Sequence, residues 1–250
     1  MHERLLAWYA ENRRDLPWRH THDPYAILVS EVMLQQTQVG RVLPRYLEWL
    51  ERWPTAASLA AAAVADVIRA WDGLGYNRRA VNLHRCAVAV TAQGGFPREP
   101  EQLRTLPGIG PYTAAAVACF AFGAQVAAPD TNARRVLGRA FGDPDMAPPP
   151  GRAYDWNQAV FDLGREVCIA RRPRCGICPL APGCPSRGQT FAPLRRQSAF
   201  EGSFRQRRSR LLKQLAAGGP MPAAELDGEA LSGLVADGLA AVSDGTATLP

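Results

Sequence analysis

The fold is decided by the stretch from Leu106 to Asn132, which opens Leu-Pro-Gly-Ile-Gly-Pro-Tyr-Thr and closes Pro-Asp-Thr-Asn. Residues 101–105 read as the end of a short helix, and Gly108 and Gly110 permit a tight turn with positive φ. Pro111 suits the first position of a new helix. The stretch therefore predicts a corner whose free backbone N–H groups bind an anion at a helix N-terminus, without reading sequence. An ordinary corner between two helices explains the same residues equally well.

A carboxylate follows at the start of the next expected helix. Asp130 lies between Pro129 and the amphipathic segment 133–141, so we expect it to cap that helix. The helix dipole and the first N–H groups favour its ionised form. Capping alone explains the residue, but the same position leaves an anion able to stabilise a nearby cation.

A second carboxylate interrupts an apolar helical segment. Glu31 lies between Ile27-Leu28-Val29-Ser30 and Val32-Met33-Leu34 in the helix expected over 24–38. Such a carboxylate is either a salt-bridge partner in the core or a functional acid. Burial favours its protonated form, which a general acid requires. The polar end Gln35-Gln36-Thr37-Gln38 would then face a partner.

Composition narrows the class of protein. The chain has 250 residues, 47% of them hydrophobic, with a net charge of +6 and a pI near 9.3, which suits a polyanionic partner. Nearly all positive charge is arginine, and the single lysine is Lys213. No leader pattern and no apolar run of roughly 18 residues is present. We therefore expect a cytoplasmic, nucleoid-associated monomer with no membrane partner.

Four cysteines share one short segment with spacing C-x6-C-x2-C-x5-C, namely Cys168, Cys175, Cys178 and Cys184. In a reducing compartment this pattern indicates a metal site. Zinc and a 4Fe-4S cluster both fit the spacing. Cys86 and Cys119 lie in helical segments and are expected to be buried apolar residues. Five arginines surround the cysteines with positive charge and predict phosphate contacts: Arg165, Arg171, Arg172, Arg174 and Arg187.

The remaining chain before residue 190 reads as helical, with helices expected at 3–14, 42–52, 56–71, 78–93 and 154–168. No strand pattern appears before residue 239, so the body is predicted to be all-α. Residues 188–200 read as a linker. Beyond it, helices at 204–216, 222–226 and 229–237 and a hairpin at 239–249 predict a winged-helix-like module. Its basic first helix could bind DNA or the module could dock on the core, and its acidic second half favours docking.

Together, Ser30–Gln38, the corner at 106–113, Asp130-Thr131-Asn132 and the cysteine segment resemble the helix-hairpin-helix DNA glycosylases. Within them, residues 3–190 are most similar to the adenine DNA glycosylases. The resemblance implies a two-lobed all-α fold: a six-helix barrel at 22–125, a cluster domain from 1–21 and 126–190, and a small module at 200–250. It also implies a 4Fe-4S cluster at the four cysteines and a double-stranded DNA partner, with a mispaired or damaged base flipped into a cleft.

The same resemblance implies roles for individual residues. Glu31 would be the general acid that protonates the leaving adenine, and Asp130 the carboxylate that stabilises the oxocarbenium-like sugar. Tyr112 matches a residue beside the sugar, Asn132 a polar partner of Asp130, and Arg19 a contact to the adenine pocket. The expected DNA contacts are Gln35, Gln36, Thr37, Gly75, Tyr76, Asn77, Leu106, Gly108, Ile109, Gly110 and Thr113.

Several alternatives stay open at this stage. Bifunctional relatives resembling endonuclease III have a lysine nucleophile where this chain has Tyr112, and residues 1–212 contain no lysine, so base removal by water is expected. The expected substrate is adenine opposite 8-oxoguanine or guanine. Thymine or uracil opposite guanine is the alternative, and a non-catalytic damage-binding protein is a third. Asn77 stands where the family has a second Tyr, and the module at 200–250 is shorter than the family's Nudix-like domain, so weaker discrimination of 8-oxoguanine is expected.

Overall fold

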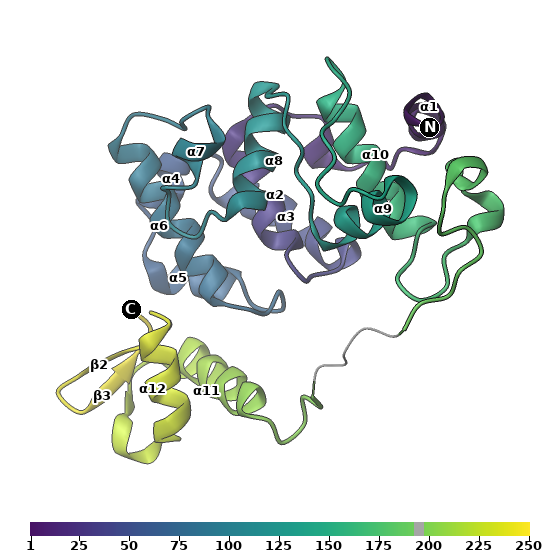
Figure 1. The fold of residues 1–250 in the computed structure, drawn as a ribbon. Coiled ribbons are helices and arrows are strands. Elements are labelled where there is room, and N and C mark those ends of the chain that lie inside the picture. Colours follow the sequence, from purple (N-terminus) through teal and green to yellow (C-terminus); the bar gives the residue numbers. More distant parts are fainter. Residues whose placement is uncertain (193–197) are drawn as a thin grey trace. The chain divides into compact units, whose positions relative to one another are not determined.

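The computed structural model describes residues 1–192 and 198–250, which form two compact units (Figure 1). The first unit comprises residues 1–28, 97–105 and 109–192, and the second comprises 29–96, 106–108 and 198–250. The middle of the predicted linker, residues 193–197, lies outside the described residues. The division into a barrel, a cluster domain and a C-terminal module stays a prediction.

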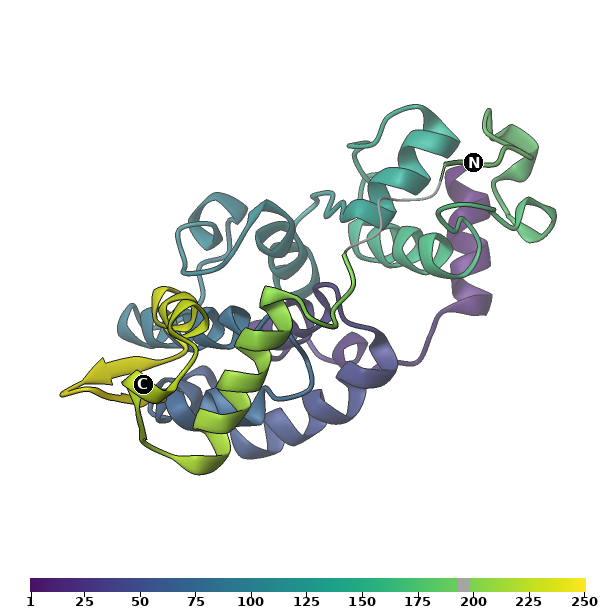
Figure 2. The same ribbon diagram turned by 90° about the horizontal axis from the view of Figure 1, so that it is seen from below.

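The first unit is built from helices that pack around α10. Its elements are α1 (His2–Asn12), η1 (Pro17–Arg19), α7 (Pro100–Leu103), α8 (Pro111–Phe122), α9 (Thr131–Phe141), α10 (Ala153–Glu166), η2 (Cys175–Ile177) and η3 (Ala181–Gly183), together with the start of α2 (Pro24–Leu34). Helix α10 packs against α1, α8 and α9, and in Figure 2 the purple helix α1, near the N label, lies beside the green helices of this unit. Apolar faces of these helices meet at Leu5, Val136, Trp156 and Leu163, each at most 1% exposed. This core is what fixes the loop that carries the four cysteines.

The second unit begins with the rest of α2 and continues through α3 (Val39–Arg52), α4 (Ala56–Ala60), α5 (Val64–Ala70) and α6 (Arg78–Ala92). Helices α4 and α5 both pack on α6. Trp49 is buried with its ring edge-on to Trp53 and Trp71, at centroid distances of 4.7 and 5.4 Å. Such edge-to-face contacts are favourable beyond the area they bury.

The single helix predicted over 56–71 is wrong, because α4 ends at Ala60 and α5 begins at Val64. Thr55 and Ser58 start α4 with reciprocal side-chain and backbone hydrogen bonds. The buried side chain of His84, on α6, forms a hydrogen bond with the carbonyl oxygen of Ala62 at 3.0 Å. A tertiary contact therefore fixes the break in a sequence whose alanines favour continuous helix.

The C-terminal module contains α11 (Phe204–Gly218), β1 (Met221–Pro222), η4 (Ala223–Glu225), α12 (Gly228–Ala236), β2 (Ala241–Ser243) and β3 (Thr246–Thr248). The strands form an antiparallel sheet in the order β1-β3-β2, with Met221 opposite Ala247. The helix predicted near 222–226 is thus a strand residue followed by a 3-10 turn, and a strand does occur before residue 239. A two-residue strand is too short to show the alternation that identifies strands in a sequence.

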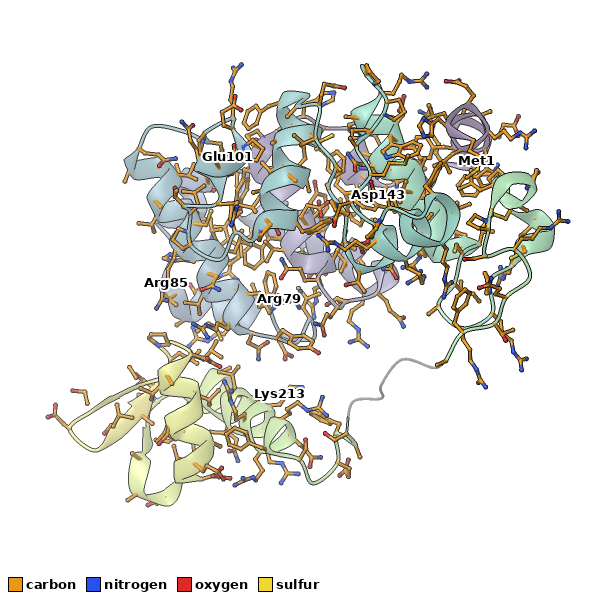
Figure 3. The ribbon with its side chains drawn as sticks, viewed as in Figure 1. Met1, Arg79, Arg85, Glu101, Asp143 and Lys213 are labelled. Carbon is orange, nitrogen blue, oxygen red and sulfur yellow. The ribbon has the colours of Figure 1, made fainter. Side chains whose placement is uncertain are left out.

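Within the second unit, the module docks on α5 and α6, as its acidic second half suggested. Leu211, Leu215 and Leu234 share an apolar cluster with Ile68 and Val81. Its basic residues are largely engaged: Arg207 pairs with Asp227 and Glu229, Arg208 with Asp237, and Lys213, labelled in Figure 3, lies 3.8 Å from Asp72. These ion pairs reduce the positive charge that α11 offers to another partner.

The fold is mostly helical, in agreement with the all-α expectation for the body of the chain. None of the helices in the described ranges is both long and apolar enough to cross a membrane.

Candidate functional site

The corner predicted over 106–113 is present between α7 and α8. Gly108 has a φ of 76°, and a Cβ there would lie 2.6 Å from the Cβ of Asn82, so both conformation and space require glycine. Gly110 caps α8 without a side-chain hydrogen bond, and Pro111 follows at its first position. Gly110 thus has no side chain with which to cap α8, and the N-terminus of a helix is a place where an anion is favoured.

The side chains of Leu106, Ile109 and Thr113 are buried, at 4%, 7% and 2% exposure. They hold the corner, whereas its exposed positions are Gly108, Gly110 and Pro111. Because these three side chains are buried, a contact of the corner with a nucleic acid would not recognise the base sequence through them.

Asp130 caps α9 as predicted and is fixed through both of its oxygens. Its Oδ1 accepts a hydrogen bond from the amide of Ala133 at 2.6 Å, and its Oδ2 accepts one from Nδ2 of Asn132 at 3.1 Å. Asn132 Oδ1 in turn accepts a hydrogen bond from Arg135 at 2.6 Å. Asn132 is thus the polar partner of Asp130 that the resemblance implied.

The hydrogen bonds continue from Asp130 toward the cysteine segment. Arg135 donates through Nε to the carbonyl oxygen of Cys168 at 2.9 Å and through Nη2 to that of Gly164 at 2.6 Å. Burial lowers the pKa of Arg135 below its usual value, while the sulfur of Cys168 opposes that effect. Arg135, which the sequence did not single out, therefore connects the predicted catalytic carboxylate to the first cysteine.

Tyr112 and Glu31 occupy different units. Tyr112 is the second residue of α8 and is partly buried, with its ring centroid 6.1 Å from that of Phe161 on α10. Glu31 is 6% exposed on the part of α2 that belongs to the second unit. The buried location predicted for Glu31 is confirmed, and its convergence with Asp130 stays a prediction.

Arg19 lies in a buried ion pair with a residue that the sequence did not identify as functional. Its guanidinium donates two hydrogen bonds to Asp162, at 2.7 and 2.9 Å, and Asp162 is fully buried. Arg14 binds the same carboxylate at 2.8 Å. Burial opposes ionisation of Arg19, but the hydrogen bonds and charge of Asp162 raise its pKa above the usual value. The one signal for Asp162 was an acidic residue inside the apolar segment Phe161-Asp162-Leu163.

One polar atom of Arg19 remains available. Among the described residues, its buried Nε has no hydrogen-bond partner. The carbonyl oxygen of Arg19 accepts a hydrogen bond from the hydroxyl of Tyr154 at 3.2 Å, and its guanidinium lies 5.8 Å from the ring of Tyr9. A buried donor without a partner is rare and marks a position that a ligand or water can satisfy.

The two remaining sets of expected DNA contacts are turns of the second unit. Helix α2 ends at Leu34, and Gln36 is exposed with a φ of 54°. Gly75 and Tyr76 have φ values of 72° and 48°, and Tyr76 is 49% exposed. The other members of these turns, Gln35, Thr37 and Asn77, are partly buried.

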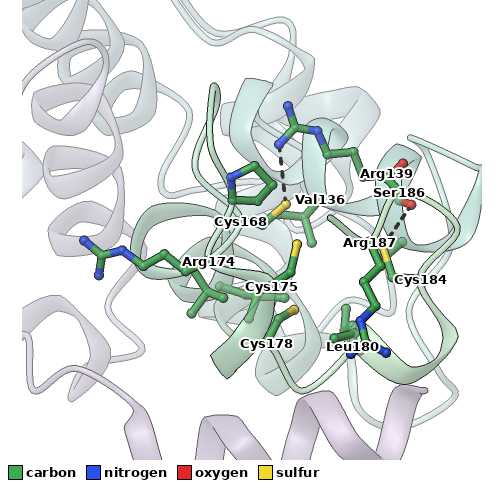
Figure 4. A pocket seen from close by; sticks show the side chains of 15 residues that line it. Val136, Arg139, Cys168, Arg174, Cys175, Cys178, Leu180, Cys184, Ser186 and Arg187 are labelled. Atoms are coloured by element: carbon green, nitrogen blue, oxygen red, sulfur yellow. Dashed lines mark hydrogen bonds between the residues drawn. The ribbon is translucent and has the colours of Figure 1, made fainter. Parts of the chain in front are cut away.

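The four cysteines line one hollow between α9, α10 and the 168–184 segment (Figure 4). Val136, Leu163 and Leu180 form part of its apolar wall. Two cysteine sulfurs accept hydrogen bonds from the protein: Cys168 from Arg139 at 3.7 Å and Cys175 from the amide of Gly188 at 3.4 Å. Burial raises the pKa of the Cys178 thiol above its usual value, so an apolar hollow alone does not favour a free thiolate there.

The donor set fits an iron-sulfur cluster. Four thiols around one hollow are the ligands that a 4Fe-4S cluster takes. Across residues 1–192 and 198–250, no group of three His, Cys, Asp or Glu side chains is arranged to hold a single metal ion. The flanking arginines are exposed, as expected for phosphate contacts: Arg165, Arg171, Arg172, Arg174 and Arg187.

Comparisons with known proteins agree with this geometry. Residues 29–152 match the HhH-GPD superfamily base excision DNA repair protein, and residues 168–184 match the iron-sulfur binding domain of endonuclease III. The fold and site therefore define a base excision DNA repair protein with an iron-sulfur loop.

Similarity to individual proteins places the chain more narrowly. It is 46% identical to the adenine DNA glycosylase of Mycolicibacterium smegmatis, over 94% of this chain and 90% of that protein. It is 44% identical to the adenine DNA glycosylase of Mycobacterium tuberculosis, over 98% of this chain and 92% of that protein. The chain belongs to the adenine DNA glycosylase family. A solved thermostable thymine-DNA glycosylase shares its fold, with a TM-score of 0.67, 31% identity, and coverage of 73% of this chain and 93% of that one.

Proposed function

We propose that this protein removes adenine from DNA where it is mispaired with 8-oxoguanine or guanine, by hydrolysis of the N-glycosidic bond. The observation that carries the assignment is the geometry at Asp130, whose two oxygens are both fixed by hydrogen bonds at the start of α9. A carboxylate held in this way is positioned in advance to stabilise positive charge that develops on a sugar. The identity to adenine DNA glycosylases over nearly the whole chain supports adenine as the base.

Glu31 is the general acid in this proposal. The carboxyl group of Glu31, buried on α2, donates a proton to the leaving adenine. Asp130 stabilises the oxocarbenium-like sugar, and Asn132 keeps that carboxylate in place. Water then adds to the sugar, which leaves an intact abasic site.

The adenine pocket is proposed to include Arg19. Its Nε is the buried donor without a partner in the described part of the chain, whereas its terminal nitrogens donate to Asp162 and to the carbonyl oxygen of Arg14. A ring nitrogen of a flipped base is an acceptor that could satisfy this donor. Asp162 therefore positions Arg19 in addition to balancing its charge.

In this proposal, main-chain N–H groups and arginine side chains of the protein bind the DNA phosphates. The N-terminus of α8 binds a phosphate, and the exposed arginines around the cysteines contact others. When bound, the 4Fe-4S cluster supplies four iron–thiolate bonds that hold the 168–184 segment in shape. Arg135 joins this segment to Asn132, so the position of Asp130 depends on an ordered loop.

A second candidate changes the base but keeps the chemistry. The fold is shared with a thymine-DNA glycosylase, so excision of thymine or uracil opposite guanine is the alternative. A non-catalytic damage-binding protein is the third, and the buried Glu31 and fixed Asp130 argue against it.

One set of assays separates these candidates. Single-turnover base release is measured on duplexes with A opposite 8-oxoguanine, A opposite G, T opposite G and U opposite G. We expect release of adenine from the first two, with loss of at least ~10²-fold in Glu31→Gln and largely unchanged binding. Release only from the last two would replace adenine with thymine or uracil, and release from none would favour the binding protein.

The expected product is an abasic site without strand cleavage. Schiff-base chemistry needs an amine, and the position of the lysine nucleophile is occupied by Tyr112. Borohydride should therefore trap little protein on DNA during turnover. Efficient trapping would show that an amine reaches the sugar and would refute the hydrolytic mechanism.

A further inference from the structure

The guanidinium of Arg79 connects two turns of the second unit. Arg79 lies in the first turn of α6 and is labelled in Figure 3. Its terminal nitrogens donate six hydrogen bonds of 2.7 to 3.2 Å, to the carbonyl oxygens of Val32, Met33, Gln35, Leu74 and Gly75 and to the hydroxyl of Thr37. The hydroxyl of Thr37 also donates to the carbonyl oxygen of Leu74 at 3.2 Å. One side chain thus joins the end of α2 to the turn that precedes α6.

Each of these turns contains a residue in the left-handed region. Gln36 has a φ of 54° and Tyr76 a φ of 48°, and in the described residues Asp244 is the one other non-glycine residue with positive φ. Such conformations are unfavourable for L-residues and persist where the surroundings fix them. Gln36 and Tyr76 are also exposed, so the strain is found at the surface of both turns.

Arg79 donates hydrogen bonds to the peptide groups that precede the two left-handed residues. The φ angle describes rotation about the N–Cα bond. The N belongs to the same planar peptide group as the preceding carbonyl, so a hydrogen bond that fixes this carbonyl restricts φ. Arg79 binds the carbonyl oxygen of Gln35, which precedes Gln36, at 2.7 Å, and that of Gly75, which precedes Tyr76, at 2.8 Å. The same guanidinium therefore holds both left-handed residues.

The charge of Arg79 is satisfied without a carboxylate. No ion pair of Arg79 occurs in the described residues, and the guanidinium instead lies 5.2 Å from the ring of Trp71 and 5.6 Å from that of Tyr76. Burial lowers its pKa to about 10, so the side chain remains charged at neutral pH. A buried cation is costly when unpaired, and here carbonyl dipoles and aromatic faces replace the counter-ion.

We propose that Arg79 is a positioning residue that holds Gln36 and Tyr76 in a DNA-receiving conformation before DNA arrives. The inference rests on the proposed function for the statement that duplex DNA is the partner of these turns. A surface that is ordered in advance loses less conformational entropy on binding, so its affinity is higher. Arg79 thereby sets how tightly the mispair is held, although its own guanidinium is turned to the protein.

The test separates positioning from charge. Arg79→Lys keeps the positive charge, but an ammonium group has three donors and no planar fork, so it cannot reproduce six hydrogen bonds. Arg79→Gln removes the charge, and Arg78→Gln is the control for loss of the same charge, since Arg78 is the exposed neighbour on the same turn and pairs with Asp237 at 3.4 Å. Dissociation constants are measured for a duplex that contains a non-cleavable deoxyadenosine analogue opposite 8-oxoguanine, together with single-turnover rates at saturating protein.

We expect Arg79→Lys and Arg79→Gln to weaken binding by about 5- to 30-fold, the effect of losing one or two stabilising interactions of ordinary size. The rate at saturating protein should fall less than the affinity. Arg78→Gln should weaken binding by clearly less than Arg79→Gln. Wild-type affinity in Arg79→Lys, or equal losses in the two glutamine variants, would show that charge alone matters and would overturn the proposal.

A measurement on the free protein makes the inference independent of the reaction. Hydrogen exchange in peptides that cover 35–37 and 74–77 should be faster in Arg79→Lys than in the wild type, and unchanged exchange would overturn the proposal. If the Arg79 variants do not fold, Thr37→Val decides the question, because it removes the hydroxyl between Arg79 and Leu74 and keeps the charge. Faster exchange in Thr37→Val supports positioning, and unchanged exchange refutes it. Failure of the wild type to bind the mispair would instead refute the proposed function.

Discussion

Asp162→Asn is expected to destabilise the first unit strongly. The substitution keeps the shape of the side chain but removes the charge that Arg19 and Arg14 share. Asp162 is fully buried and the side chain of Arg19 is 7% exposed, so a buried guanidinium would lose its counter-ion. The neutral amide also presents one acceptor where the carboxylate presents two.

The magnitude follows from this burial. Removing one partner of a buried ion pair costs about 3–5 kcal/mol of unfolding free energy, because the remaining charge is left uncompensated. In a protein of this size, each kcal/mol lowers the melting temperature by about 2–4 °C. We therefore expect the transition of the first unit to move down by about 6–20 °C.

The assay follows the first unit by the absorption of the iron-sulfur loop, and the whole chain by circular dichroism, during heating. Asp155→Asn is the matched control on the same helix, because Asp155 and Arg152 are both about half exposed and lie 3.7 Å apart. An exposed pair of this kind contributes at most about 1 kcal/mol. Equal small shifts in the two variants would refute the reasoning that burial makes the Asp162 pair important.

Three further predictions follow from the site. Cys178→Ser should lose iron and the broad absorption near about 400 nm that is expected for thiolate-to-iron charge transfer, and a wild-type iron content would contradict ligation by this residue. Burial raises the pKa of Cys86 to about 12 and that of Cys119 to about 11, so both thiols should stay protonated and resist alkylation at pH 8 in the folded protein. After removal of iron under folding conditions, mass spectrometry should find label on the loop cysteines first, and equal labelling of all six would show that the two sites open. Asn77→Tyr should increase the preference for 8-oxoguanine over guanine opposite adenine, since stacking on a base contributes about 1–3 kcal/mol, and an unchanged ratio of single-turnover rates would exclude this position as a determinant.

The raised thiol pKa values also set the direction of one pH dependence. The Cys86 thiol ionises near 9 in an unfolded chain and near 12 in the folded one, so its stabilising contribution is complete below pH 9 and is lost as the pH rises toward 12. In urea unfolding, the free energy of unfolding should therefore decrease between pH 8 and 11. This decrease should be smaller in Cys86→Ala than in the wild type.

The amino-acid sequence by itself determined the features that depend on neighbouring residues. The corner at 106–113, the cap at Asp130 and the cysteine spacing each arise from contacts within a few residues, so turn, cap and ligand preferences predicted them. The fold class followed as well, because helical periodicity runs through the body of the chain. The burial of Glu31 was predicted for the same reason, since its neighbours on α2 are apolar.

The tertiary structure decided the features that join distant positions. Arg19 and Asp162 are 143 residues apart in sequence, and Arg79 binds carbonyl groups up to 47 residues away. The break between α4 and α5 and the short strand β1 likewise depend on partners elsewhere in the chain. No periodicity links such pairs, and a backbone carbonyl that accepts a hydrogen bond has no signature in the sequence. A buried charge needs a hydrogen-bonded partner, because burial lowers the dielectric around it. Which residue supplies that partner depends on the element that the fold places next to it.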